Sequence, residues 1–304
     1  MKSILYLFII LLLSSEAAFT QSKSSRRKVI DTHFHALRWN SFGSPPPANM
    51  VTGVSPVAKS DSAEQSIMLA ELRKHNIVKA VLSGVPVLVD KYFETDANRL
   101  LRAFLVNNEA QLPDTVSFAR SARDGKIQAF GELDLQYFGR VLTDSLFEPY
   151  LSICERYNIP ILLHTGTSFP NTPYICCPKF RTSLGNPILI EDVLVKHPKL
   201  RVQLAHMGYP WLEGTKAILA EYPQVFVDVA AIDWLIPKTD FYIYLKALVD
   251  AGFADRIMYG SDEMIWSDSF GLSIQNIEAA PFLTEKQKAD IFYNNAARFY
   301  NISK

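Results

Sequence analysis

The sequence predicts an α/β fold, a single (β/α)8 TIM barrel, and three observations carry that prediction. Short apolar segments of strand length alternate with segments of helix length along residues 29–304, the pattern of parallel strands joined by helices. Eight such strand segments can be recognised, and eight parallel strands close into a barrel. No linker interrupts the alternation, so residues 29–304 are expected to form one domain.

The first strand is expected at 29–35, because Val and Ile suit the pleat of a sheet. The remaining strands are expected at 78–84, 116–119, 127–133, 159–164, 200–206, 225–229 and 256–262. Helices are expected at 61–76, 95–109, 144–157, 187–197, 212–222, 241–251 and 284–300. Residues 36–60 contain three consecutive prolines and no periodic pattern. A loop of this length directly after the first strand is expected to cover a functional site.

The amino end has the three-part pattern of a secretory signal. Lys2 precedes an unbroken apolar run at residues 4–13, and small and polar residues follow it. The run is too short to span a bilayer as a helix of the mature protein. We therefore predict a signal peptide at 1–20, a flexible polar leader at 21–28, and an exported protein, periplasmic or secreted, with no stable membrane insertion after cleavage.

Charge and cysteine content narrow the class of protein further. The chain has 31 basic and 31 acidic residues, which disfavours a nucleic-acid partner and leaves a small-molecule substrate; a homo-oligomer stays open. Cys154, Cys176 and Cys177 cannot all pair, and adjacent cysteines rarely bridge each other. Disulfides are thus not expected to form the framework, and Cys154 is expected as a buried thiol on an apolar helix face.

Polar residues occur where the predicted strands end. Active sites of such barrels lie at the carboxyl ends of the strands, and six metal-competent side chains fall there: His33, His35, Glu132, His164, His206 and Asp262. His33 and His35 are two residues apart on a strand, so both imidazoles leave the same face. Burying these polar groups would be costly without a partner, and a metal ion is such a partner. Imidazole suits zinc, manganese, iron or cobalt.

Several residues near this rim have more than one interpretation. Glu132 could be a ligand or could hold a ligand histidine from behind. Asp228 on the seventh strand is interpreted as structural, and Cys176 with Cys177 as loop packing. Aromatic and basic side chains in the loops could shape a pocket for a substrate with an anionic or planar part: Arg38, Trp39, Tyr174, Arg181, Trp234 and Trp266.

The chain resembles the amidohydrolase superfamily, in its amidohydrolase-2 branch. The segments that carry the resemblance run through the whole mature chain and read DTHFH, GELDLQY, PILLHTG, LRVQLAHMG, VFVDV, RIMYGSDEM and LTEKQKADIFYNNAARFY. The resemblance implies a distorted (β/α)8 barrel with one or two divalent metals. It implies His33, His35, His164 and Asp262 as ligands.

The resemblance also implies catalytic roles for two residues. Asp262 would take a proton from the attacking water, and His206 would polarise the substrate or act as acid and base. Some branches of the superfamily bridge two metals with a carbamylated lysine on the fourth strand. This chain has Glu132 there, similar to the TatD-like pattern, so a bridging role or a place behind a ligand both remain open.

These expectations combine into one function and two alternatives. The first is a metal-dependent hydrolase in which activated water attacks a small ester, lactone or amide carbonyl, with zinc as the expected ion and manganese as an alternative. The second is a metal-dependent non-oxidative decarboxylase of an aromatic or unsaturated carboxylate. The third is a non-catalytic metal-binding barrel, which the presence of His206 and Asp262 disfavours. The export signal favours hydrolysis.

Overall fold

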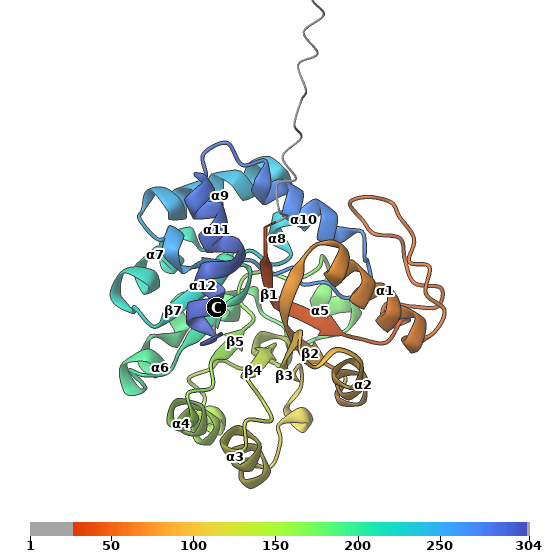
Figure 1. Cartoon of the computed structure of the whole chain (residues 1–304). Helices are drawn as coiled ribbons and strands as arrows, with labels where there is room; N and C mark the ends of the chain where they lie inside the picture. The colour runs from red at the N-terminus through yellow and green to blue at the C-terminus, as the bar shows by residue number, and fades with distance from the viewer. Residues whose placement is uncertain (1–26, 303–304) are drawn as a thin grey trace, which may run out of the picture.

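The computed structural model describes residues 27–302, and its centre is a barrel of eight parallel strands with helices around it (Figure 1). The strands follow one another in chain order: β1 Val29–Ala36, β2 Ile77–Gly84, β3 Leu100–Val106, β4 Ala129–Leu133, β5 Ile161–Leu163, β6 Val202–Leu204, β7 Val225–Asp228 and β8 Ile257–Met258. The segment after β8 joins β1 through Thr32 N to Tyr259 O (3.0 Å) and His35 N to Glu263 O (3.1 Å). The predicted (β/α)8 barrel is confirmed.

Helices surround the strands: α1 Asp61–Lys74, α2 Pro86–Asp96, α3 Thr115–Arg123, α4 Glu148–Tyr157, α6 Glu191–Lys196, α7 Leu212–Glu221, α9 Lys238–Asp250, α10 Ser269–Glu278, α11 Glu285–Ala289 and α12 Asn295–Phe299. Two shorter helices, α5 Thr172–Ile175 and α8 Ile232–Leu235, lie in the loops after β5 and β7. A π-helical turn, Asp290–Asn294, joins α11 to α12. Within residues 27–302, no helix has the length and apolar character needed to cross a membrane. The predicted signal peptide lies outside the described residues.

The prediction was wrong between residues 95 and 119. The segment expected as a helix at 95–109 contains β3, and the strand expected at 116–119 lies within α3. Leu, Ala and Arg are good helix formers, but β3 pairs with β2 through Ala80 and Leu100 and with β4 through Ala103 and Ala129. Pairing on both sides outweighs local propensity here. Asp114 caps the amino end of α3, and its side chain accepts a hydrogen bond from Ser117 N (2.9 Å).

The loop from 37 to 60 packs against the segments that follow β5 and β8. The Phe42 ring lies 4.9 Å from the Trp266 ring and 6.3 Å from the Phe169 ring. The Trp266 indole N–H donates to the Pro47 carbonyl oxygen at 3.0 Å. The loop therefore borders the end of the barrel at which β5 and β8 stop, which is the position expected for a cover.

Cys176 and Cys177 form a disulfide between neighbours, so the expectation that they would not pair was wrong. A tight turn after α5 explains the pairing. The backbone N–H groups of both cysteines donate to the Thr172 carbonyl oxygen, at 3.2 and 3.1 Å, which holds the two residues on one side of the turn. Cys154 is a buried free thiol, as expected.

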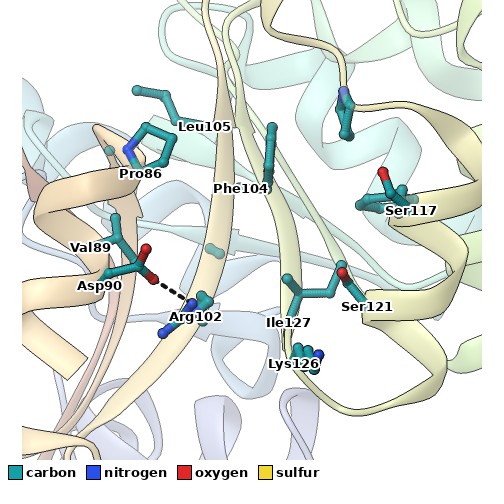
Figure 2. Close-up of a pocket in the computed structure, with 14 residues that line it drawn as sticks. Pro86, Val89, Asp90, Arg102, Phe104, Leu105, Ser117, Ser121, Lys126 and Ile127 are labelled. Atoms are coloured by element: carbon teal, nitrogen blue, oxygen red, sulfur yellow. Dashed lines mark hydrogen bonds and ion pairs between the residues drawn. The ribbon is translucent and has the colours of Figure 1, made fainter. Parts of the chain in front are cut away.

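A groove with a volume of about 270 Å³ lies on the outside of the barrel between α2 and α3, over β3 (Figure 2). The groove has a largely apolar lining that includes Val89 and Phe104, and Arg102 pairs with Asp90 at 2.6 Å beside them. None of the residues predicted for the functional site lines this groove.

Candidate metal centre

Four of the predicted residues converge at the carboxyl end of the barrel. His33 and His35 come from β1, Glu132 from β4, and Asp262 from the segment after β8. One ligand atom from each residue lies within 4.8 Å of the others, and all four residues are buried. The closest pairs are His35 Nε2 to Asp262 Oδ1 at 3.0 Å and His33 Nε2 to Glu132 Oε2 at 3.1 Å. The His-x-His spacing therefore places both imidazoles in one buried space, as expected.

The other ring nitrogen of each of these two histidines, Nδ1, contacts a polar side chain outside the cluster. His33 Nδ1 lies 3.3 Å from Asp228 Oδ2, and His35 Nδ1 lies 3.1 Å from Ser83 Oγ. An ionised carboxylate accepts hydrogen bonds and cannot donate them, so Asp228 selects the His33 tautomer with hydrogen on Nδ1. Nε2 of His33 is then left with its lone pair directed at the cluster, which is the arrangement of a metal-ligating histidine.

Glu132 lies between the histidines rather than behind one of them. Its Oε2 is 3.4 Å from His35 Nε2, and its Oε1 is 3.6 Å from His206 Nε2. Burial alone would raise the pKa of Glu132, but electrostatic attraction to the surrounding histidines, His33 above all, holds it well below its usual range. Glu132 is thus an ionised carboxylate with an oxygen directed toward each side of the site.

His164 and His206 form a second group with Glu132. Their rings meet edge to face with centroids 4.8 Å apart. His206 Nδ1 lies 2.8 Å from the Ala230 carbonyl oxygen, so Nδ1 donates and Nε2 faces Glu132. His206 has a left-handed backbone with φ of 60°, and its N–H donates to Asp228 Oδ1 at 2.9 Å. The structure places His164 in this second group and not in the four-residue cluster.

Burial and charge act in opposite directions on these two histidines. Burial lowers the pKa of His164 to about 4, which keeps its ring neutral. Burial would also lower the pKa of His206, but the neighbouring carboxylates of Glu132 and Asp262 raise it above the ordinary value. The pKa values of the two histidines therefore shift in opposite directions.

The sequence did not reveal the contacts that two residues, Asp228 and Tyr137, make with the site histidines. Asp228 was interpreted as structural, and it contacts both His33 and the backbone of His206. It ends a strand like the other site residues, which was the available signal. Tyr137, just after β4, places its hydroxyl 3.5 Å from His164 Nε2 and 2.6 Å from Ser168 Oγ. Its presence in the segment GELDLQY was the only sign of it.

The candidate substrate residues lie in different surroundings. Trp234 and Trp266 are buried in one apolar cluster with Ile265. Their indole N–H groups donate to backbone oxygens of Ser261 (2.8 Å) and Pro47 (3.0 Å).

The other candidates lie in the loops. Arg38 is exposed and pairs with Asp61 at 2.9 Å, and Trp39 is half-buried beside it. Arg181 is exposed and donates to the backbone oxygens of Pro178 and Phe180. Tyr174 is 88% exposed, so it does not line the buried cluster.

The donor set fits a divalent cation. His33 Nε2 and Glu132 Oε1 are buried and make no hydrogen bond within the described residues, although each faces polar groups of the cluster. No Lys or Arg side chain is buried anywhere in residues 27–302, so the chain itself brings no fixed positive charge to Glu132 and Asp262. Imidazole nitrogen and carboxylate oxygen are the ligands used by zinc and manganese. A cation between them would satisfy both orphaned atoms.

Comparison with known families agrees with this site. The amidohydrolase family model, Amidohydro_2, matches residues 30–302. The chain belongs to the amidohydrolase family. A search of curated proteins found no match. The match to the family model places the chain in an enzyme family that acts on small-molecule substrates.

Solved structures share the fold at low sequence identity. A probable 2-pyrone-4,6-dicarboxylic acid hydrolase from Acinetobacter baumannii, solved with citric acid, is 15% identical with a TM-score of 0.62, over 90% of this chain and 100% of that one. A 5-carboxyvanillate decarboxylase from Sphingomonas paucimobilis is 16% identical with a TM-score of 0.58, over 91% and 99%. The corresponding decarboxylase from Novosphingobium aromaticivorans, solved with manganese, is 17% identical with a TM-score of 0.55, over 77% and 79%.

Proposed function

We propose that this protein is a zinc-dependent hydrolase that cleaves the carbonyl–oxygen or carbonyl–nitrogen bond of a small ester, lactone or amide. The observation that supports the proposal is the buried cluster of His33, His35, Glu132 and Asp262, with His206 facing Glu132 from the side. Because no Lys or Arg is buried in the described residues, a substrate carboxylate would find no fixed cation from the chain. This favours a neutral carbonyl substrate.

His33, His35 and Asp262 would hold the ion, and Glu132 would reach toward His164 as a bridging ligand. One ion would occupy the four-residue cluster, and a second would need His164 and the remaining oxygen of Glu132. A divalent ion held there would supply Lewis acidity that activates water and polarises a carbonyl oxygen. Manganese is the competing ion, because one fold neighbour was solved with it.

The side chains of this protein would move the protons. Asp262 is 6% exposed and has its Oδ1 3.0 Å from His35 Nε2, so it can accept the proton that water releases as its oxygen bonds to the carbonyl carbon. His206 is anchored through Nδ1 and presents Nε2 to the site. It would donate a proton to the oxygen or nitrogen that leaves when the second bond breaks.

Loop residues would bound the substrate. Trp234 and Trp266 form an apolar cluster in the segments after β7 and β8, which suits the hydrocarbon part of a small ester or lactone. Arg38, Trp39 and Arg181 lie in the loops after β1 and β5, and we propose them as contacts at the entrance.

A second candidate is a non-oxidative decarboxylase of an aromatic or unsaturated carboxylate. The fold neighbours that carry this activity favour it. In that reaction the substrate carboxylate would be held by the ion, and His206 would deliver the proton that replaces carbon dioxide. The same four-residue cluster would serve, so the two candidates differ in substrate and not in the metal site.

Elemental analysis and a substrate panel would test the proposal. Protein purified without chelators should contain at least one equivalent of zinc, and it should hydrolyse a member of a panel of lactones, esters and amides while leaving aryl carboxylates unchanged. His33→Ala should lose metal and activity together. The matched control is His75→Ala, because His75 lies at the end of α1 and outside the donor groups.

Three outcomes would contradict the proposal in different ways. Protein without any transition metal would refute the metal site. Turnover of aryl carboxylates with release of carbon dioxide would replace the hydrolase by the decarboxylase. Metal-loaded protein inactive on every class would favour a binding protein.

A further inference from the structure

We infer that Tyr300, Gln203 and Asp228 form a hydrogen-bonded relay that positions His33 and thereby sets the metal affinity of the site. The inference rests on the metal site of the proposed function, and it is independent of which reaction the site performs. Three contacts between polar atoms connect the four residues without a gap.

The relay begins at the carboxyl end of the chain. The Tyr300 hydroxyl donates to Gln203 Oε1 at 2.6 Å. With its oxygen so engaged, Gln203 directs its amide nitrogen toward Asp228 Oδ2, to which it donates at 2.5 Å. The same Asp228 oxygen lies 3.3 Å from His33 Nδ1. Each contact fixes the direction of the next, because the amide has one accepting and one donating end.

The relay ends on a candidate ligand. Asp228 is fully buried and acts only as an acceptor: its Oδ2 takes the Gln203 amide and the His33 N–H, and its Oδ1 takes the backbone N–H groups of His206 and Ala230 at 2.9 and 3.0 Å. With all these donors directed at it, Asp228 accepts from Nδ1 of His33, so that Nε2 is available to an ion.

The placement of Gln203 argues for a purpose beyond packing. It is fully buried on β6, in a barrel interior where branched aliphatic side chains are usual. Its amide nitrogen also donates to Thr32 Oγ1 at 3.0 Å, so both ends of the side chain are satisfied. A leucine here would avoid the desolvation of an amide, yet it would leave Asp228 with one donor fewer.

Tyr300 reaches the relay from outside the barrel. It follows α12, and its ring packs against Val81, Ala103 and Ala129 of β2, β3 and β4. The carboxyl-terminal helix lies against β1 and β8, and Figure 1 shows α12 and the carboxyl end over the barrel. The hydroxyl of one tail residue thus completes a network that ends at His33, 267 positions earlier (300 minus 33).

Two variants and a control test the relay through zinc affinity, measured by competition with a chromophoric chelator on the full mature protein. Tyr300→Phe removes one hydroxyl and keeps the ring, and it should weaken zinc binding by roughly threefold to tenfold. Asp228→Asn should weaken it by roughly 10–100-fold, the range found when partners behind metal ligands are removed. Tyr150→Phe is the control. Tyr150 lies on α4, away from the site, and its hydroxyl donates to the Pro113 carbonyl oxygen at 2.6 Å. The substitution should leave the affinity unchanged.

Each other outcome overturns the inference. Unchanged affinity in Tyr300→Phe would break the relay, even if Asp228→Asn weakened binding, because only a local Asp228–His33 pair would remain. An equal loss in Tyr150→Phe would assign the effect to general stability. A wild-type protein that binds no zinc or manganese would overturn the relay together with the metal site. That failure is distinguishable, because it appears before any substitution is made. If Asp228→Asn does not fold, the conservative Tyr300→Phe still decides.

Discussion

Replacing His206 by asparagine should separate catalysis from metal binding. Asn can place its amide nitrogen near the position of His206 Nδ1, which lies 2.8 Å from the Ala230 oxygen, so the anchoring hydrogen bond can persist. Asn also tolerates the left-handed backbone at this position, where φ is 60°. What the substitution removes is the edge of the ring that carries Nε2, 3.6 Å from Glu132 Oε1.

The expected loss follows from that missing group. A positioned acid or base contributes roughly 10²–10⁴ to a rate. A hundredfold loss in turnover corresponds to about 2.7 kcal/mol of transition-state stabilisation. Metal content should stay near normal, because His206 is absent from the cluster of His33, His35, Glu132 and Asp262. Folding should be almost unaffected, because the anchor and the backbone conformation are both kept.

The assay combines kcat on the substrate found by the panel with elemental analysis of the same preparation. His75→Asn serves as the control for removal of an imidazole away from the site. Full turnover in His206→Asn would refute the acid–base assignment. A variant that had lost its metal would make His206 a ligand, in a second group with Glu132 and His164.

Three further predictions concern stability, backbone and processing. Burial and the charge of Asp61 raise the pKa of Glu64 from 4.5 to about 7, so the folded protein keeps a proton that the unfolded chain releases, and stability falls as pH rises through that window. Glu64→Gln should then gain about 1–2 kcal/mol at pH 8, after an allowance for solvent screening, and nothing below pH 4.5, as measured by urea unfolding. Gly131→Ala should lose about 3 kcal/mol or more, because φ is 141° and a Cβ would overlap the Leu162 oxygen; Gly125→Ala, with φ of 65° and open space, should lose much less. Terminal sequencing of exported protein should begin near Gln21, and an intact amino end on cytosolic protein would contradict the signal peptide.

The residues on the rim of the barrel could be predicted because strand geometry is regular. His33 and His35 are two positions apart on β1, so their side chains share a face whatever the rest of the chain does. Glu132, His164 and His206 lie at the ends of neighbouring strands, β4, β5 and β6. Parallel strands end at the same edge, so their last residues must meet. This argument needs only strand ends, and those were placed within a few residues.

The segment around β3 could not be predicted in the same way. Leu100–Val106 lacks a turn signal that would separate it from a helix, and its identity depends on partners in β2 and β4. The disulfide between Cys176 and Cys177 depends on a local turn around Thr172. Neither the pairing of a strand nor the shape of a loop is encoded in the spacing of apolar residues.

The hydrogen-bond partners of Gln203 in the barrel interior could not be predicted for a related reason. Gln203 reads as one polar residue inside an apolar strand, and its partner Tyr300 lies 97 positions away. Sequence shows that such a residue is costly in a core. It does not show which group repays the cost, because that group is brought close only when the barrel closes.

Charge balance links these features to the function. Glu132, Asp228 and Asp262 surround His33 in a space where the described chain buries no Lys or Arg. Buried carboxylates need a compensating charge, and the histidines can provide it only by taking protons on the nitrogens that face the carboxylates. Asp228 already uses the proton on Nδ1 of His33, and Nε2 makes no hydrogen bond to the chain. A divalent ion satisfies both demands at once, since it neutralises the carboxylates and accepts the lone pair of Nε2. The contact between Asp228 and Nδ1 therefore leaves Nε2 of His33 available to an ion.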